Sequence, residues 1–467
     1  MTSAGQQKRG VLPLLFTMVW IAGLPTFVIF ANRVLSHVPV LKADRVLCLL
    51  AAAMSVVAAL RRPRTLQPVG RVEKAMVVYL TVILVSWVTT LPHKTVAAFK
   101  QDADFLLTCF LMPFTAFLIA RNTPWTPLRI RTCLWALVGG VGTYLVLFGA
   151  VQYTYDWNFL VAEAIKNVHP DRAKGPFENA VPYGVVLSML VPLTLFLYAR
   201  ARGRLARGAL VTIAIGLIEG IVASKTRAIW VGLPVALVLP SLRHPRIRPL
   251  AALLTADLAL QVLLAPAVGL DFWGLQQRLV EPEPVYARVA ASATASNMAE
   301  HRPLFGFGFG MFTFQDDKAA YYASWGSIPE TFAVYPNSPH NDFLNVLVCM
   351  GLFGLIPYLV LLWTSWQVLS RGRARGQPGD PVGRELAGFI EAVFVILLIV
   401  GQFHAVMRMS YAQVLFFFLL GIVAREPGVA LETADGRRRS TELMSAPEWS
   451  AGQPAARISS IPAGGAR

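Results

Sequence analysis

The chain has 467 residues, of which 55% are hydrophobic and 15% charged, and its apolar residues are gathered into long runs. Runs of roughly 18 or more apolar residues are typical of membrane-spanning helices, so the composition excludes an ordinary soluble protein. The formal net charge of +16 does not indicate nucleic-acid binding, because no basic face and no interleaving of aromatic and basic residues accompanies it.

The apolar runs, taken in chain order, predict an all-α integral membrane protein. The first run, from Val11 to Ala31, follows Lys8 and Arg9 and is too long for the apolar region of a cleaved signal sequence. We interpret it as a first span whose N-terminus is cytoplasmic. Together with it, further predicted spans make about twelve, at roughly 44–60, 73–91, 103–120, 131–152, 181–198, 208–224, 228–242, 249–270, 341–365, 385–403 and 405–424.

The distribution of arginine gives an independent test of this topology. Every second predicted loop is rich in arginine, as the positive-inside rule requires of cytoplasmic loops. The arginine-rich loops hold Arg61, Arg62, Arg64 and Arg71; Arg121, Arg129 and Arg131; Arg200, Arg202, Arg204 and Arg207; Arg243, Arg246 and Arg248; and Arg371, Arg373, Arg375 and Arg384.

The same topology divides the chain into three parts. Residues 1–10 are predicted to be a cytoplasmic N-terminus, and residues 11–425 the membrane body, which includes a large periplasmic loop at 271–339. Residues 426–467 are rich in Gly, Pro, Ser and Ala without apolar periodicity, so they are predicted to be a disordered cytoplasmic tail. The four cysteines lie inside apolar runs with neither disulfide nor metal-site spacing, which predicts packed thiols.

A loop rich in Pro and Asn (Y-P-N-S-P-H-N-D, residues 335–342) leads into one of the predicted spans. Asn337 or Ser338 is the expected N-cap, with Pro339 in the first turn, which would leave His340 at the positive end of the helix dipole. A neutral imidazole is favoured at that position, and a neutral imidazole can accept a proton.

Cations also gather on the predicted outer side, where nothing in the topology requires them. Outer loops at about 153–180 and 271–339 contain Arg172 and Arg288, the short hairpin 224–227 (S-K-T-R) contains Lys225 and Arg227, and Arg408 lies near the outer end of the last span. Guanidinium groups suit phosphate oxygens, and a neutral His340 beside them could remove a proton from an attacking hydroxyl. This combination is suited to transferring a group from a diphosphate.

Two other features of the outer loops point to structure rather than to chemistry. The glycine run 306–310 (G-F-G-F-G) lacks the sequence of a nucleotide-binding loop, so we expect its glycines to permit tight turns and close backbone approach. The carboxylates at Glu281, Glu283, Asp316 and Asp317 have no clear metal-ligand spacing. We expect neither a metal ion nor a cofactor.

The runs R-P-L-F-G-F-G-F-G-M-F (302–312) and P-H-N-D-F-L-N-V-L-V-C-M-G-L-F-G-L (339–355) resemble the shared signature of the O-antigen ligase and O-antigen polymerase superfamily. The segments 224–230 and 175–184 resemble that family more loosely, and the resemblance covers about 11–425. It implies an inner-membrane glycosyltransferase with about twelve spans. Ligases of the family move polymeric O-antigen from undecaprenyl diphosphate to a sugar of lipid A–core, without metal or nucleotide.

The resemblance also implies site residues. His340 matches the essential histidine of the family, in a His–Asn pair completed by Asn341, while Arg227 and Arg288 match its arginines. Position 292 is Ser where many members have tryptophan four residues after the second arginine. We assign His340 as the catalytic residue, Asn341 as a supporting residue, and the diphosphate to Arg227, Arg288, Lys225, Arg172 and Arg408.

Two alternatives to an O-antigen ligase stay open. A polymerase would use the same donor, although the chain length and the size of the outer loop favour a ligase. A lipid-linked sugar transporter or flippase would also suit twelve spans, but transporters tend to have related halves and broken helices in mid-membrane. Here the chemistry-bearing residues lie on one side in loops that do not recur in both halves, which favours an enzyme. The expected partners are the lipid-linked O-antigen, the lipid A–core acceptor and membrane lipids, with no nucleic acid.

Overall fold

The computed structural model describes residues 11–34, 42–60, 67–155, 172–177, 179–270, 273–334, 336–375 and 381–425. Over these residues the chain is helical without a strand, and the only β-type pairing there is an isolated bridge between Trp325 and Ile328. The predicted N-terminal segment 1–10, the predicted tail 426–467, and residues 156–171 and 178 of the predicted outer loop at about 153–180 lie outside the described residues.

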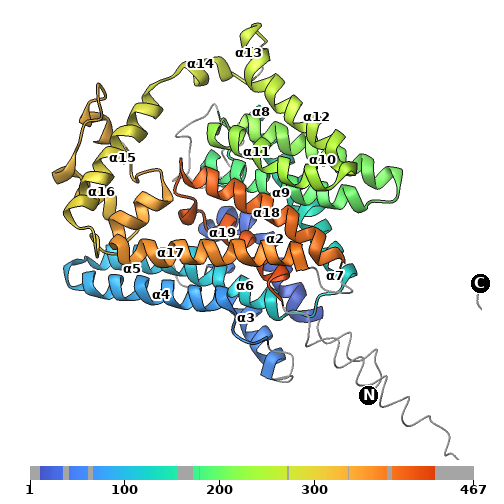
Figure 1. Cartoon of the computed structure of the whole chain (residues 1–467), viewed down its shortest axis with the longest axis horizontal. Helices are drawn as coiled ribbons and strands as arrows, with labels where there is room; N and C mark the ends of the chain where they lie inside the picture. Colours follow the sequence, from blue (N-terminus) through green and yellow to red (C-terminus); the bar gives the residue numbers. More distant parts are fainter. Residues whose placement is uncertain are drawn as a thin grey trace, which may run out of the picture. The chain divides into compact units, whose positions relative to one another are not determined.

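The helices of the compact unit that ends at Arg425 are shown in Figure 1. In chain order they are α2 (Val11–Val34), α3 (Ala43–Leu60), α4 (Arg71–Thr90), α5 (Val96–Leu106), α6 (Met112–Asn122), α7 (Pro127–Trp135), α8 (Thr143–Tyr155), α9 (Ala180–Arg200), α10 (Arg204–Ala223), α11 (Arg227–Arg243), α12 (Arg248–Ala259), α13 (Ala265–Ala267), α14 (Leu275–Val280), α15 (Glu283–His301), α16 (Thr313–Asp317), α17 (Asp342–Arg375), α18 (Pro381–Gly401) and α19 (Ser410–Val423).

Seven helical stretches of the described chain are long and apolar enough to cross a membrane, which confirms the class of protein but not the full count. They are Arg71–His93, Val96–Asn122, Pro127–Thr154, Ala180–Arg200, Arg204–Ala223, Pro245–Ala267 and Asp342–Ala374. The other five predicted spans also correspond to helices (α2, α3, α11, α18 and α19). The figure of twelve spans stays a prediction, as does the side on which each end lies.

The core of the unit is built around α9, which is almost wholly buried and packs against α10 and α18. Helix α19 packs on α6, and α17 packs on both α4 and α18. Since lipid offers no hydrophobic advantage to helix contacts, such a bundle depends on close packing of apolar and aromatic side chains. Phe196 and Phe389, for example, meet edge to face between α9 and α18. All four cysteines are buried free thiols, as the sequence predicted.

The arginine-rich loops and the proposed site residues lie at opposite ends of the helices. Arg200 and Arg243 are at the C-terminal ends of α9 and α11, where they bind Glu385 and Glu391 of α18 at 3.0 Å and 2.8 Å. Arg227 and His340 are at or just before the N-terminal ends of α11 and α17. These two arginines of the predicted cytoplasmic loops therefore lie at the opposite helix ends from the two proposed site residues, and the membrane topology itself stays a prediction.

The segment 271–339 carries the short helices α14 and α16 and the longer helix α15. Helix α14 leads across to α15 and α16, which lie beside the end of the bundle where α4 meets α5 and where α17 begins (Figure 1). Its hydrophobic contacts form a small second cluster of Ala291, Ala295, Met298 and Phe314 with Val348 of α17. The segment is thus packed onto the bundle.

Candidate functional site

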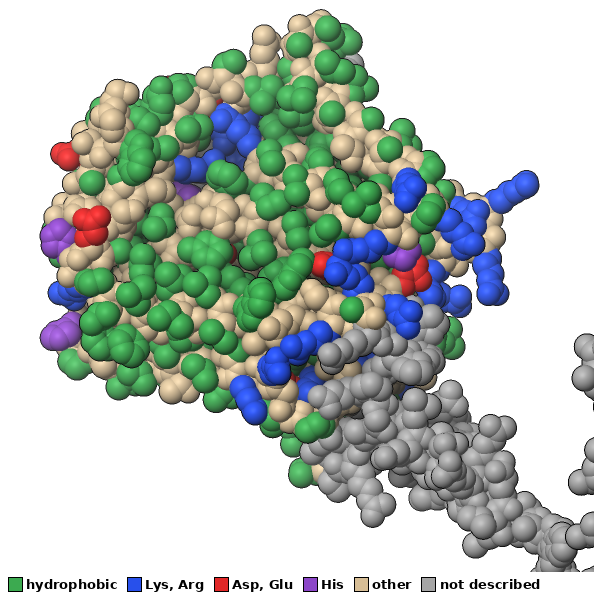
Figure 2. All heavy atoms as spheres, viewed as in Figure 1, with side chains coloured by type: hydrophobic (Ala, Val, Ile, Leu, Met, Phe, Trp, Pro, Cys, Tyr) green, Lys and Arg blue, Asp and Glu red, His purple; other side chains and the backbone are tan. Residues whose placement is uncertain are grey.

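A hollow containing several Lys and Arg side chains, with a histidine beside them, lies on the side of the bundle near α15 (Figure 2). Charged residues that act on one another in this part of the protein come from five places in the sequence. They are Arg172, the hairpin 224–227, Arg278 and Arg288 of α14 and α15, His340, and the linker between α18 and α19. We call this group the basic cluster.

The hairpin 224–227 is held in place by Arg172. The Arg172 guanidinium donates to the Ser224 carbonyl at 2.9 Å and to the Thr226 hydroxyl at 3.2 Å. Lys225 has a left-handed backbone conformation (φ 50°) and is only 4% exposed. The side chain of Lys225 is thus buried where the hairpin folds against the body of the protein, and its predicted position on the outer side of the membrane stays a prediction. Arg172 and Lys225 are therefore part of the wall that presents Arg227.

Arg227 and Arg288 lie close enough to influence each other, together with Arg278. Arg227 donates to the Glu281 backbone carbonyl at 3.2 Å, and Arg278 pairs with the Glu281 carboxylate at 2.6 Å. Burial and the positive charges of Arg278 and Arg227 lower the pKa of Arg288 to about 10. An arginine whose charge is disfavoured by its neighbours gains most when an anion binds, so this arrangement favours a multiply charged anionic ligand.

His340 is located immediately before α17, and the predicted helix start is wrong by three to four residues. Asn341 is the N-cap, because its side-chain oxygen accepts the Leu344 amide at 3.0 Å. Ser338, one of the two predicted caps, instead accepts the His340 amide at 3.4 Å, in the turn before the helix. Pro339 therefore precedes the helix. His340 itself has φ 52°, a conformation uncommon for a residue other than glycine.

The His340 ring is electrically neutral at physiological pH. Burial and the positive charges of Arg288 and Arg408 lower its pKa to about 4, so the ring carries an unprotonated nitrogen. Arg288 therefore lies within electrostatic range of both Arg227 and His340, while the assignment of these residues to one catalytic site stays a prediction.

The glycine run holds the outer segment onto a break in α17, which confirms its predicted backbone role. Helix α17 is interrupted at Gly351 (φ 59°). The amides of Phe307 and Gly308 donate to the carbonyls of Val348 and Cys349 at 2.9 Å and 2.7 Å, and the amides of Leu352 and Phe353 donate to the carbonyls of Pro303 and Leu304 at 2.8 Å and 3.1 Å. Polar backbone groups freed by the break are thereby satisfied.

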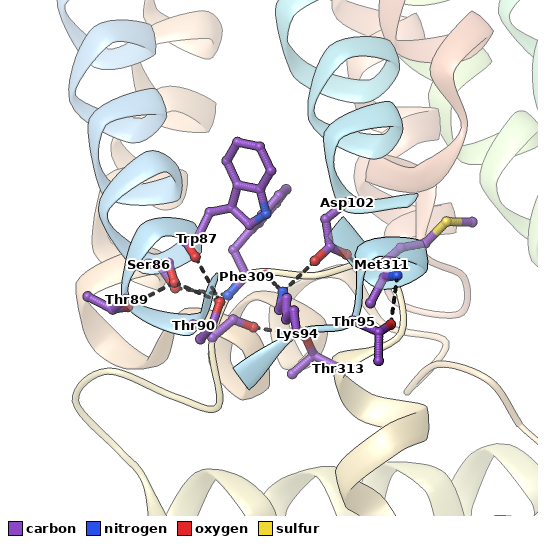
Figure 3. A network of polar contacts seen from close by, with 12 residues as sticks. Ser86, Trp87, Thr89, Thr90, Lys94, Thr95, Asp102, Phe309, Met311 and Thr313 are labelled. Atoms are coloured by element: carbon purple, nitrogen blue, oxygen red, sulfur yellow. Dashed lines mark hydrogen bonds and ion pairs between the residues drawn. The ribbon is translucent and has the colours of Figure 1, made fainter. Parts of the chain in front are cut away.

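A polar network ties the same segment to the turn between α4 and α5 (Figure 3). Lys94 pairs with the buried carboxylate of Asp102 and donates to the Phe309 carbonyl at 2.6 Å. Asp102 also accepts the Met311 amide at 2.7 Å. The Phe309 side chain is directed into the core, where it stacks on Phe105. The outer segment that follows α15 is thus attached to the bundle at two points, the break in α17 and the turn between α4 and α5.

Arg408 does not lie within the last helix, as the predicted span 405–424 implied, because α19 begins at Ser410. It lies in the linker 402–409, where it donates to the Met311 carbonyl and covers the ring of Phe105. Asn341, the predicted supporting residue, holds the same linker by donating to the Gln402 carbonyl at 3.1 Å. Arg408 thus faces His340 from a different element from Arg288.

Sequence reasoning missed two members of the cluster. Arg278 was not assigned a role, because its proximity to Arg227 and Arg288 depends on how α14 crosses to α15. His404 lies next to the predicted end of the span 385–403, so it was not considered. Its ring is 6.0 Å from that of His340, centroid to centroid.

Below the start of α17 lies a pocket lined mainly by apolar and aromatic side chains from α4, α6, α17, α18 and α19. Asp342 and Phe343, which directly follow the His–Asn pair, belong to its lining. The described part of the chain thus brings an apolar space close to the basic cluster.

These features define a polytopic helical membrane protein with a cationic, histidine-containing site at one end of its bundle. Residues 208–359 match the family model described as O-antigen ligase, which confirms the resemblance to the O-antigen ligase and polymerase superfamily. No curated protein matches the chain. The match supports an activity of the O-antigen ligase or polymerase type, with lipid-linked glycans as substrates. It includes Arg227, Arg288 and His340, but not Arg172, His404 or Arg408.

Proposed function

We propose that the protein is an O-antigen ligase of the bacterial inner membrane. It transfers polymeric O-antigen from undecaprenyl diphosphate to a sugar hydroxyl of lipid A–core on the periplasmic side, with both termini cytoplasmic. The observation that carries the proposal is the meeting of a neutral His340 with Arg227, Arg278 and Arg288 next to an apolar cavity. The family match supports the same reaction class.

We assign a part of the reaction to each group. The acceptor hydroxyl attacks the anomeric carbon of the lipid-linked glycan, its proton passes to His340, and the carbon–oxygen bond to the diphosphate breaks. The electron pair leaves with the diphosphate, whose negative charge the arginines stabilise. The cavity below α17 would receive part of the prenyl chain, because its lining is apolar.

Substitution of Arg227 or Arg288 by alanine is expected to weaken donor use. Loss of a hydrogen bond to a charged group costs about 1.5–3 kcal/mol, which corresponds to roughly a tenfold to hundredfold fall in kcat/KM for the donor. The measurement is transfer by purified, reconstituted protein at varied concentrations of lipid-diphosphate-linked glycan. Arg204→Ala is the matched control, because Arg204 is exposed at the opposite end of the helices. Unchanged donor kinetics in both Arg227→Ala and Arg288→Ala would contradict diphosphate binding by the cluster.

Deletion of the gene is expected to separate a ligase from a polymerase and from a flippase. Loss of a ligase leaves long glycan chains on the lipid carrier and lipid A–core without O-antigen. Loss of a polymerase instead gives core capped by a single repeat unit, and loss of a flippase leaves single units on the carrier at the cytoplasmic side. Lipopolysaccharide and lipid-linked glycans are analysed by gel electrophoresis and mass spectrometry. Only the first pattern supports the proposal.

A further inference from the structure

A second histidine lies against His340 in the basic cluster. His404 is 6% exposed, and its ring plane makes an angle of 89° with that of His340 at a centroid distance of 6.0 Å. Perpendicular ring pairs at such distances are a favoured aromatic arrangement. Nothing in the proposed reaction, as described above, uses this side chain.

The linker that carries His404 is fastened to the turn that follows His340. Asn341 donates to the Gln402 carbonyl at 3.1 Å, and the Met407 amide donates to the Asp342 carboxylate at 3.0 Å. Within the linker, the His404 amide donates to the Val400 carbonyl, and the Val406 amide donates to the His404 carbonyl. The two residues after His340 therefore set the position of the His404 ring, so the two imidazoles are held as a pair.

Several cations lie around His404. Burial, followed by Arg288, by His340 when it is protonated, and by Arg172 and Arg278, lowers the pKa of His404. Arginine has five donors and no acceptor. Among the side chains of the described cluster that act on either ring, the two neutral imidazoles are thus the proton acceptors. Without His404, a protonated His340 would face only the cations of the cluster.

We propose that His404 is a positioning residue for His340. It fixes the tilt of the His340 ring and, through its unprotonated ring nitrogen, stabilises the imidazolium that forms when His340 takes the proton of the acceptor hydroxyl. The inference rests on the proposed function, because it assumes that His340 receives that proton. The role resembles that of any group that orients a catalytic base and favours its charged form.

Three variants of His404 test this role. His404→Phe keeps a ring that can pack against His340 but removes both nitrogens, whereas His404→Asn and His404→Gln place an amide near the position of one ring nitrogen or the other. Initial rates of glycan transfer are measured with purified protein in liposomes, using a lipid-diphosphate-linked glycan and a lipid A–core acceptor. Phe403→Leu is the matched control, because Phe403 is in the same linker and is 47% exposed.

We expect His404→Phe to lower kcat by about tenfold or more, a part of the full contribution of a general base, with the donor KM within about twofold of the parent value. We expect one of the amide variants to recover part of the lost kcat and the control to behave as the parent. Thermal unfolding of each purified variant shows whether the linker stays folded.

Two results would overturn the inference. The first is a kcat in His404→Phe equal to that of the parent protein. The second is an equal loss of kcat in all three variants together with a lowered unfolding temperature, which would show that His404 serves only in packing. Both results can be distinguished from failure of the proposed function. The proposed function would fail if a His340→Ala variant kept full transfer activity.

Discussion

Replacement of His340 by alanine is expected to lower glycan transfer by about 100-fold to 10,000-fold, the usual contribution of a general base. The reason is that the arginines around it can donate but cannot accept the proton of the attacking hydroxyl. The variant should be inserted and folded as the parent protein, because the side chain precedes α17 and the helix is capped by Asn341. Transfer is measured both in cells, as lipopolysaccharide ladders, and with reconstituted protein.

The backbone at His340 makes the choice of variants important. Since φ is 52° there, alanine retains a strained conformation, whereas asparagine tolerates the left-handed region. His340→Asn is therefore the cleaner variant, and it should be equally inactive with an unfolding temperature close to that of the parent. His301→Ala serves as the histidine control, because His301 is exposed on α15. Normal lipopolysaccharide ladders from both His340 variants would remove this histidine from the mechanism.

The helical membrane class and the two ends of the bundle could be predicted from the sequence. Apolar runs of spanning length are a direct consequence of bilayer thickness, and arginine placement responds to topology. Arg227, Arg288 and His340 could be found because they are polar groups in places where a membrane protein does not need them, and because the motifs around them resemble a known family. Their meeting in one hollow is consistent with this reasoning.

What the sequence did not reveal depends on contacts between distant segments. The start of α17 was misplaced because the residue types of both Ser338 and Asn341 favour the N-cap position. Only the fold determines which of the two side chains accepts a hydrogen bond from a backbone amide in the first turn of the helix. The break at Gly351 lies inside a continuous apolar run, and its amides and carbonyls are satisfied by residues 303–308. His404 was missed for the same kind of reason, because the linker 402–409 is fixed by Asn341 and Asp342.

The close approach of the glycine run to the break in α17 leads to a second large expected effect. Gly306 has φ 65°, and a side-chain carbon at this position would meet the backbone of α17 between Val348 and Gly351. Gly306→Ala is therefore expected to destabilise the protein by more than the roughly 1–3 kcal/mol that left-handed strain alone costs. The same substitution should lower transfer activity, because the segment 303–311 directly follows α15, which carries Arg288.

Gly326 provides a matched control for this substitution. It also has a positive φ, of 57°, but no atom lies near the place that a side-chain carbon would occupy. Gly326→Ala thus suffers only the backbone strain, and the difference in unfolding temperature between the two variants measures the steric effect of α17. If Gly306→Ala unfolds at the same temperature as Gly326→Ala and transfers glycan at the parental rate, the outer segment is not held by the broken helix. A large difference would instead show that Gly351 and Gly306 together hold the segment that carries Arg288 against His340.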